Sequence, residues 1–438
     1  MLHKILQFLW GDLNKQEVKK FGLLSLALFF TIASYWLLRP LKDGIFKSLI
    51  GMSYQPKAKV LTLIIMIPLI LIYSKLVNVY KKDKLFYIIS FFYGFLFLII
   101  GLLLLHPTIG LANTVKSCDR ILGWVCYVSI ESMGSILIAL FWSFVASSVD
   151  SDSAKRGFAL IVSGGQLGGI LGPTLATYSE KLGLPLLFCI AALFIFIVSI
   201  VIKIFMRFIK NRDYSDEFAV VQNDQKPTGI WEGLKLLCTK KYLLGIFVIA
   251  TFYEVIGTIV DYQMKVLAEQ TFLTPESFTA FMGLYGQYAN FVALILALVG
   301  TSYLMRSFGL IFCLLAFPIA IGVVTINLYL HQGLWAALIA MIAIKSLSYA
   351  LNNPSKEMMY IPTSKDVKFK AKSWIDMFGG RFGKAAGSGI NNIFQDSITL
   401  LMFYGTIVAL GLVSVWIVAA ILVGAKFNYL VKNNKIIE

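Results

Sequence analysis

The stretch LPLLFCIAALFIFIVSIVIKIFM at 184–206 decides the fold, because its 23 residues include a single charged side chain, that of Lys203. An α-helix needs about 20 apolar residues to cross the hydrocarbon core of a bilayer. Comparable runs follow one another from Phe21 to Gly424 with short polar breaks. Hydrophobic residues make up 58% of the 438 residues and charged residues 14%, a composition too apolar for a soluble protein. The sequence therefore predicts a helical membrane protein.

Runs of this length predict about twelve membrane-spanning helices in an all-α polytopic fold. The predicted spans are 21–38, 60–80, 85–105, 124–146, 157–178, 184–206, 242–264, 279–303, 307–328, 333–351, 373–395 and 400–424. The N-terminal segment lacks the basic, apolar and small-residue succession of a cleavable signal peptide, so we expect the first span to stay attached.

Lysine and arginine residues favour one side of the predicted membrane. Basic clusters occur at both termini and in alternate connections, among them 81–84, 207–241 and 356–372. Short cytoplasmic loops carry the excess of positive charge, so we expect these segments and both termini in the cytoplasm. The net charge of +16 is therefore explained mostly by topology rather than by nucleic-acid binding. The basic segment 37–59 violates the rule, and its charges need another explanation.

The polar stretch at 207–241 is typical of a linker between two halves of six spans each. It predicts an N-terminal bundle over 1–206 and a C-terminal bundle over 242–438. One sequence repeat supports this division: Asp43 and Lys47 recur, with the same spacing, as Asp261 and Lys265.

A second repeat lies at a nearly equal offset, where GGQLGGILG at 164–172 matches GGRFGKAAG at 379–387. Together the repeats predict two pseudo-symmetric six-helix bundles around a midplane site, a major-facilitator-like arrangement. The second segment is not a phosphate-binding P-loop, because it lacks the first glycine and the Ser or Thr of that motif. Glycines four residues apart instead predict close helix packing, through Gly164, Gly168, Gly172, Gly379, Gly383 and Gly387.

Ionisable side chains within the predicted spans carry the functional information, since burying a charge in a membrane is costly unless it faces a cavity, a partner or a substrate. Steps of seven and eleven residues place Glu254, Asp261 and Lys265 on one helical face. Cations outnumber acids in the whole set, which suggests an anionic ligand such as a polyphosphate. Structural salt bridges are the alternative. The set is Arg39, Lys42, Asp43, Lys47, Glu131, Glu254, Asp261, Lys265, Lys345, Asp376, Arg381 and Lys384.

Cysteines and histidines are few and scattered, without metal-ligand spacing, so we expect no metal and no cofactor. The cysteines are expected to be free thiols, with a disulfide between Cys118 and Cys126 as the alternative.

Three segments resemble the ATP/ADP translocase family, the nucleotide transporters of intracellular bacteria and plastids. LLRPLKD at 37–43 is similar to that family's LRTLKD segment, and NPSKEMMYIP at 353–362 is similar to its DPTKEMAYIP loop. KSWIDMFGGRFGKAAGS at 372–388 resembles its KAAIDVVGSRLGKSGGS helix. The resemblance extends over most of the chain in span count and order, and it is close in these three segments.

The resemblance implies that Lys42, Glu131, an acid in the seventh span and Lys384 line a transport path. Asp261 occupies the position of that acid, where the family usually has glutamate, and Pro40 replaces the usual threonine. It also implies a cytoplasmic loop motif that comprises Asn353, Pro354, Lys356 and Glu357.

We therefore expect a nucleotide transporter, not an enzyme, that exchanges ATP for ADP across a bacterial cytoplasmic (inner) membrane by alternating access, as a monomer. Import of other nucleotides by proton coupling or uniport is one alternative, and a nucleotide-binding membrane scaffold is another. The side chains expected to grip phosphate are Arg39, Lys42, Lys47, Lys265, Arg381 and Lys384. The acids expected to gate the cavity are Asp43, Glu131, Glu254, Asp261 and Asp376.

Overall fold

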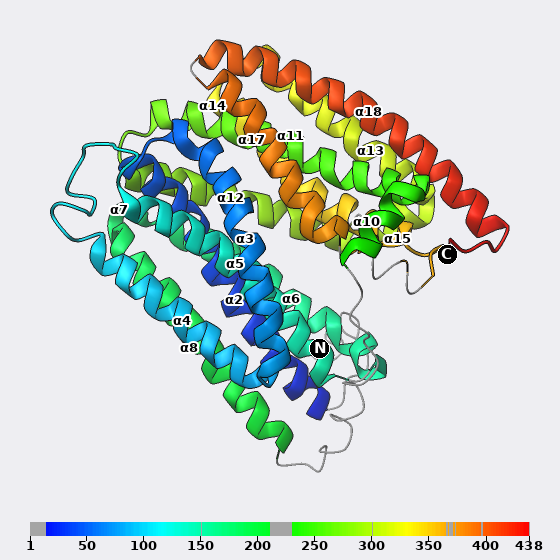
Figure 1. The fold of residues 1–438 in the computed structure, drawn as a ribbon, viewed down its shortest axis with the longest axis horizontal. Helices are drawn as coiled ribbons and strands as arrows, with labels where there is room; N and C mark the ends of the chain where they lie inside the picture. Colours follow the sequence, from blue (N-terminus) through cyan, green and yellow to red (C-terminus); the bar gives the residue numbers. More distant parts are fainter. Residues whose placement is uncertain are drawn as a thin grey trace. The chain divides into compact units, whose positions relative to one another are not determined.

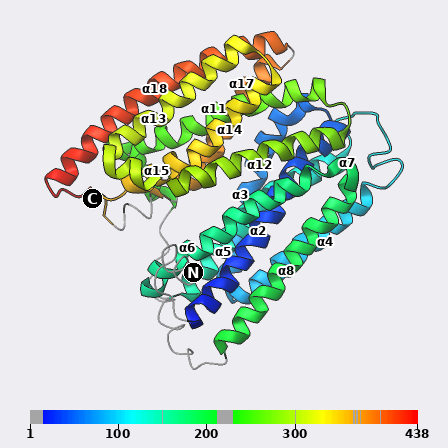
Figure 2. The same cartoon turned by 180° about the vertical axis from the view of Figure 1, so that it is seen from behind.

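The computed structural model describes residues 15–149, 151–210, 230–299, 301–364, 367, 371–372, 374–395 and 397–437. The regular structure of these residues is helical, apart from one isolated parallel bridge between Thr363 and Ile437. Figures 1 and 2 show the helices from two opposite sides.

The helices of the N-terminal half are long, and short turns connect most of them. They are α2 Lys15–Leu49, η1 Met52–Tyr54, α3 Gln55–Val79, α4 Lys82–Leu103, α5 Ile121–Ser148, α6 Ser151–Ala176, α7 Ser179–Leu182 and α8 Leu184–Lys210.

The C-terminal half begins with a short helix and contains two five-residue π-helical segments, η2 and η3. Its elements are α10 Ile230–Thr239, α11 Lys241–Thr271, α12 Pro275–Val299, α13 Thr301–His331, α14 Leu334–Leu347, η2 Ser348–Asn352, α15 Asn353–Met359, η3 Ile375–Gly379, α17 Gly380–Phe394 and α18 Ile398–Lys432. Both described ends of the predicted linker 207–241 are helical, and its central residues 211–229 lie outside the described residues.

Eleven helices of the described chain are long and apolar enough to cross a membrane. They match eleven of the twelve predicted spans, which confirms the all-α polytopic fold. The exception is the predicted span 373–395, which is helical over η3 and α17 but includes Asp376, Arg381 and Lys384. This segment is therefore not among the helices that are apolar enough to cross a membrane.

The first span is longer than predicted. Helix α2 continues past residue 38 to Leu49, although Pro40 lies inside it and cannot donate a backbone hydrogen bond. The prediction that the charged residues after residue 38 lie in a connection is therefore wrong. Lys42, Asp43 and Lys47 are part of the helix, and each is 3% exposed.

The helices form two compact units. Unit 1 comprises the described residues within Met1–Gly51, Ile64–Gln225 and Phe272–Gln287. Unit 2 comprises those within Met52–Leu63, Lys226–Thr271 and Tyr288–Glu438. Each unit thus includes one short segment from the other half of the sequence: the start of α3 belongs to unit 2, and the start of α12 belongs to unit 1.

Helix α2 is the centre of unit 1, where it packs against α5, α6 and α8. Gly168 of α6 lies against the backbone of α2, because a Cβ there would meet the carbonyl oxygen of Phe29 and would lie 3.1 Å from the nitrogen of Ala33. Gly164 and Gly172 meet α2 carbonyl oxygens in the same way, one turn before and one turn after. The prediction of close packing along this glycine stripe is confirmed.

Helix α11 has the corresponding place in unit 2, where it packs against α14, α17 and α18. A Cβ at Gly383 would lie 2.7 Å from the carbonyl oxygen of Thr251, and one at Gly387 would lie 2.7 Å from that of Val255. The second glycine stripe therefore holds α17 against α11 as the first holds α6 against α2.

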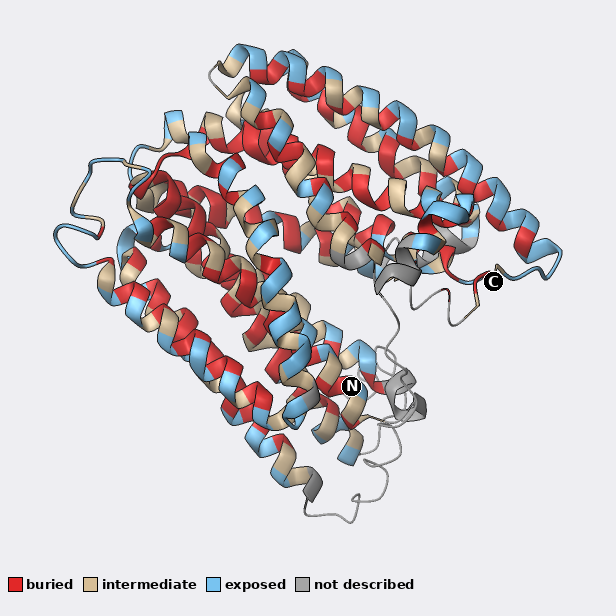
Figure 3. Cartoon of the chain, in the orientation of Figure 1, coloured by how far each residue is buried: buried red, intermediate tan, exposed pale blue. Residues whose placement is uncertain are grey.

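Burial within each unit follows the helix contacts, as Figure 3 shows. Helix α18 alternates buried side chains such as Trp416 with exposed apolar ones such as Ile407 and Leu422. An apolar outward face is what lipid requires of a membrane helix. All five cysteines are free thiols.

Replacing Gly387 with alanine should destabilise the protein by about 1–3 kcal/mol, because its methyl group would overlap the carbonyl oxygen of Val255 and force α17 away from α11. The measurement is the thermal midpoint of purified protein in detergent. Gly389→Ala is the matched control on the same helix, since nothing lies within 4 Å of a Cβ there. Equal midpoints for the two variants would contradict the packing role.

Candidate substrate site

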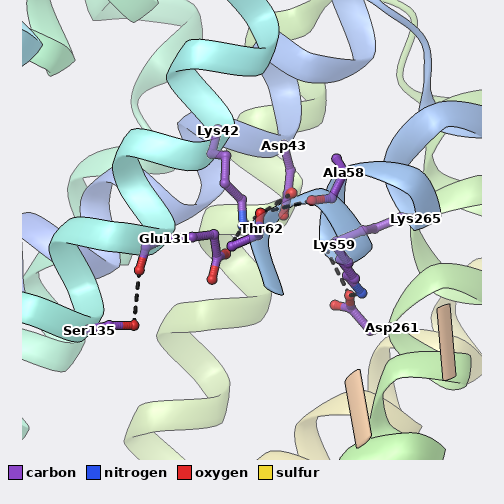
Figure 4. A network of polar contacts seen from close by, with 9 residues as sticks. All are labelled: Lys42, Asp43, Ala58, Lys59, Thr62, Glu131, Ser135, Asp261 and Lys265. Atoms are coloured by element: carbon purple, nitrogen blue, oxygen red, sulfur yellow. Dashed lines mark hydrogen bonds and ion pairs between the residues drawn. The ribbon is translucent and has the colours of Figure 1, made fainter. Parts of the chain in front are cut away.

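Within unit 1, a charged cluster joins α2 to α5. The Lys42 ammonium donates a hydrogen bond to Oε1 of Glu131, and its Nζ lies 3.8 Å from Oδ1 of Asp43. Figure 4 shows Lys42 reaching towards Glu131, whose backbone carbonyl accepts a 3.1 Å hydrogen bond from the Ser135 hydroxyl. One ammonium group thus contacts two carboxylates.

The members of this cluster differ in accessibility. The side chains of Lys42 and Asp43 are each 4% exposed, whereas that of Glu131 is 23% exposed. Removing one partner of a buried ion pair leaves an uncompensated charge, which costs several kcal/mol. Glu131 is therefore the more accessible of the two carboxylates that contact Lys42.

Aromatic rings accompany both cations at this end of α2. The Lys42 ammonium lies 4.4 Å from the centre of the Tyr127 ring, and the Arg39 guanidinium lies 5.0 Å from that of Trp36. The face of an aromatic ring attracts a cation without neutralising it. The rings therefore stabilise the two cations without supplying negative charge.

Within unit 2, Asp261 of α11 binds two lysines with the same oxygen. Its Oδ2 lies 2.9 Å from Nζ of Lys265, one turn later on α11, and 3.0 Å from Nζ of Lys59 on α3. Both contacts are drawn in Figure 4. These three residues carry a net charge of +1, and their side chains are at most 15% exposed.

Lys59 is a member of the site that the sequence analysis missed. It lies in the basic segment 37–59, whose charges did not fit the topology rule. The structure explains the charge of Lys59, because its ammonium donates a hydrogen bond to Asp261, which lies 202 residues away in the chain. The available signal was a lysine inside an apolar run, within the candidate span Met52–Val77.

Lys47 has a different environment from the other predicted phosphate ligands. Its ammonium donates hydrogen bonds to the backbone carbonyls of Phe272 and Leu273, the latter at 3.1 Å, and lies 5.1 Å from the ring centre of Phe278. Lys47 and Lys42 are also separated by about 140° around α2, so they face different directions. Lys47 thus fixes the end of α2 to the segment that follows α11.

Glu254 of α11 lies against α17, the helix that carries Arg381 and Lys384. Glu254 is half-buried, and its Cβ lies 2.8 Å from where a Cβ of Gly383 would be. Arg381 is half-buried and Lys384 is exposed. Asp376 lies in η3, but its side chain is outside the described residues.

Lys345 of α14 contacts a tyrosine on α11. Its ammonium lies 3.2 Å from the hydroxyl oxygen of Tyr253 and 5.5 Å from the centre of that ring. Lys345 thereby contributes a further cation to the helices around α11.

The predicted loop motif at 353–362 is helical over most of its length, so the prediction of a loop there is wrong. Asn353, Pro354, Lys356 and Glu357 belong to α15, which continues α14 through the π-helical segment η2. Glu357 forms a 2.7 Å ion pair with Lys372.

The connection after α15 is held by two more contacts. The Tyr242 hydroxyl donates a 2.7 Å hydrogen bond to the carbonyl of Met359 at the end of α15. Near the C-terminus, Ile437 donates a 2.9 Å backbone hydrogen bond to Pro362 and accepts one of 2.9 Å from Ser364. The segment that carries the motif is thus fixed at both α11 and the C-terminus.

Comparison with known proteins identifies the family of this chain. The sequence model of the TLC ATP/ADP transporter family matches residues 1–427. The chain belongs to this family. Its relatives include "ADP,ATP carrier protein 1" of Chlamydia muridarum, 25% identical over 95% of this chain and 90% of the relative. The protein of the same name from Rickettsia prowazekii is 25% identical over 99% and 98%. "ADP,ATP carrier protein 2, chloroplastic" of Arabidopsis thaliana is 26% identical over 96% and 76%.

Solved structures with a similar fold are also transporters. A mutant of the nucleoside transporter NupG has a TM-score of 0.65 at 14% identity and covers 93% of this chain and 100% of its own. A bacterial homologue of the iron transporter ferroportin has a TM-score of 0.65 at 12% identity, over 92% and 99%. The fold is therefore major-facilitator-like, and the family is one of multi-pass membrane transporters rather than enzymes.

Replacing Asp261 with asparagine should lower the thermal midpoint, because Lys59 and Lys265 would then lose a shared carboxylate and repel each other. We expect a loss of about 3–5 kcal/mol. Adding Lys59→Met to Asp261→Asn should restore part of this stability, since one of the two cations is removed.

Lys57 of α3 provides the matched control, because it is exposed and lies over the ring of Tyr54. Adding Lys57→Met to Asp261→Asn should restore nothing. If both double variants melt at the temperature of Asp261→Asn alone, the contact between Lys59 and Asp261 does not contribute to stability.

Proposed function

We propose that this protein exchanges ATP for ADP across a bacterial cytoplasmic membrane by alternating access. The proposal rests on membership of the TLC ATP/ADP transporter family and on relatives named as ADP,ATP carriers. The observation that carries it in this chain is Asp261, whose single carboxylate binds both Lys59 and Lys265. Lysines that gather around one carboxylate in this way are suited to a polyphosphate.

The phosphate groups are bound by side chains from both halves of the sequence. In the empty carrier, Glu131 neutralises Lys42, and Asp261 neutralises Lys265 in part. Phosphate oxygens accept hydrogen bonds from ammonium and guanidinium groups as carboxylates do, so they can replace these acids as partners. The proposed phosphate ligands are Arg39, Lys42, Lys59, Lys265, Arg381 and Lys384. Lys47, bound to backbone carbonyls, is proposed to fix the end of α2 during this process.

The excess positive charge explains why the uptake of one nucleotide would be coupled to the release of another. An empty carrier that reorients must carry unneutralised cations through a dry, occluded state, which is costly. A bound nucleotide supplies the missing negative charge and lowers that barrier. The acids Asp43, Glu131, Glu254, Asp261 and Asp376 are proposed to gate the cavity by exchanging partners with the cations.

The proposed topology follows the distribution of basic residues. Both termini are cytoplasmic, and 207–241 links six-helix halves over 1–206 and 242–438. A single chain contains both halves of a complete pathway, so the proposed working unit is a monomer. The substrates are ATP and ADP, and nucleic acid is not a partner.

Proton-coupled import of nucleotides is a second candidate, favoured by one observation. Glu131 is 23% exposed while its partner Lys42 is 4% exposed, so Glu131 is positioned to exchange a proton with solvent. Uptake would then collapse when a protonophore removes the proton gradient.

The decisive experiment is uptake of radiolabelled ATP by proteoliposomes that contain the purified protein. Vesicles preloaded with ADP are compared with empty vesicles. Uptake by each kind of vesicle is measured in the presence and in the absence of a protonophore. Exchange predicts uptake only with preloaded ADP and no effect of the protonophore. Equal filling of empty vesicles would replace exchange by uniport or proton coupling, and saturable ATP binding without uptake would indicate a scaffold.

Replacing Lys42 or Lys384 with alanine should reduce ATP/ADP exchange by at least about tenfold, because each variant removes a charge-assisted hydrogen bond to phosphate. Lys384 is exposed, so Lys384→Ala should keep the thermal midpoint of the wild-type protein. Lys57→Ala is the control for loss of an exposed lysine. Wild-type exchange by both site variants would overturn the phosphate assignment.

A further inference from the structure

Helix α17 has a continuous polar face besides its glycine face. Arg381 and Lys384 begin this face, and four uncharged polar residues follow them at helical spacing. Steps of three, four and seven residues keep such side chains within about 100° of one another around a helix. The uncharged members are Ser388, Asn391 and Asn392 of α17 and Gln395 at its C-cap.

These four residues share an unusual property. The Oγ of Ser388, the Oδ1 atoms of Asn391 and Asn392, and the Oε1 of Gln395 are buried and accept or donate no hydrogen bond among the residues that the structure describes. Ser388 and Asn391 are each 1% exposed. Buried polar atoms in proteins are nearly always hydrogen-bonded, and a membrane offers no water to satisfy them.

Packing alone does not account for this face. Among these four side chains, and within the described part of the chain, only that of Asn391 forms a hydrogen bond to a neighbouring helix. Its amide nitrogen donates a 3.1 Å hydrogen bond to the carbonyl of Thr258 on α11. The close contact of α17 with α11 is made by Gly383 and Gly387 on a neighbouring face. Apolar side chains of similar volume would fill the positions of Ser388 and Asn392 without leaving polar atoms unpaired.

We propose that Ser388, Asn391, Asn392 and Gln395 bind the nucleoside part of the substrate and set its base preference. This inference rests on the proposed function, in which Arg381 and Lys384 bind the phosphates. Along α17, the charged side chains come first and the neutral hydrogen-bonding side chains follow. Asn391 lies about 10 Å beyond Lys384 along the helix axis. A nucleotide has the same order, with its polyphosphate at one end and its nucleoside at the other.

The chemistry of the side chains fits an adenine nucleoside. An asparagine amide presents one donor and one acceptor side by side, which matches the N6 amine and the N7 acceptor of adenine. Guanine presents the acceptor O6 in place of that amine and would not satisfy the same pair. The hydroxyl of Ser388, which lies between Lys384 and Asn391 along the helix, is suited to a ribose hydroxyl, and the amide of Gln395 lies at the far end, beside the base. The backbone contacts of Gly383 and Gly387 hold the whole face in a fixed position.

The test measures exchange of radiolabelled ADP into ATP-loaded proteoliposomes, with unlabelled ATP, GTP and inorganic tripolyphosphate as competitors. Asn392→Leu replaces the amide by an apolar group of similar size, and Ser388→Ala removes the hydroxyl. For Asn392→Leu we expect the ATP concentration for half-inhibition to rise about fivefold or more, with that of tripolyphosphate unchanged. The preference for ATP over GTP should fall by a similar factor.

Ile393→Ala is the matched control, because this neighbouring side chain is 70% exposed and lies off the polar face. It should leave all three competitors unchanged, and the thermal midpoint of each variant reports its folding. Equal weakening of ATP and tripolyphosphate, or an unchanged ATP to GTP ratio in both polar variants, would overturn the nucleoside assignment. Failure of the proposed function is distinct, because wild-type protein would then show no exchange at all.

Discussion

Asp261 binds the ammonium groups of Lys59 and Lys265 with one carboxylate oxygen, and the charge balance of the C-terminal helices depends on this contact. An unpaired ammonium in an apolar environment is costly, so each buried lysine of this chain has an acidic, carbonyl or aromatic partner. Lys42 has Glu131, Lys47 has backbone carbonyls, and Lys345 has Tyr253. These partners stabilise the cations without removing their excess charge, which is the property that the proposed phosphate site requires.

The glycine stripes make these contacts possible. Gly168 on α6 and Gly383 on α17 lie against the backbones of α2 and α11, the two helices that carry Lys42 and Asp261. Close backbone packing fixes the position and rotation of these helices, because interiors are densely packed and resist small displacements. In each unit, the helix with buried charges is thus supported by a glycine-rich helix. The same arrangement in both units agrees with the repeat found in the sequence.

The spans and the glycine packing could be predicted from the sequence because they depend on local periodicity and composition. The extension of α2 beyond Pro40 could not, because proline usually ends a helix and only packing around Lys42 and Asp43 overrides that tendency. Lys59 was missed for a different reason. Its partner Asp261 is 202 residues away, and contacts between distant segments leave no local pattern. The sequence did not indicate that α15 is helical, because Pro354 usually argues against a helix. This proline is tolerated because it lies in the first turn.

ATP carries one more negative charge than ADP, so one fixed set of cations cannot neutralise both to the same extent. In the proposed exchange, a group that changes partner or proton must absorb the difference. Unit 1 offers such a group, because Lys42 contacts both Asp43 and Glu131, and Glu131 is the more exposed of these acids. In unit 2, Lys59 and Lys265 share one oxygen of Asp261. In the proposed exchange, the pair of Lys42 with Glu131 would therefore be the contact that adjusts to the nucleotide that is bound, while the lysines around Asp261 would supply positive charge to both nucleotides.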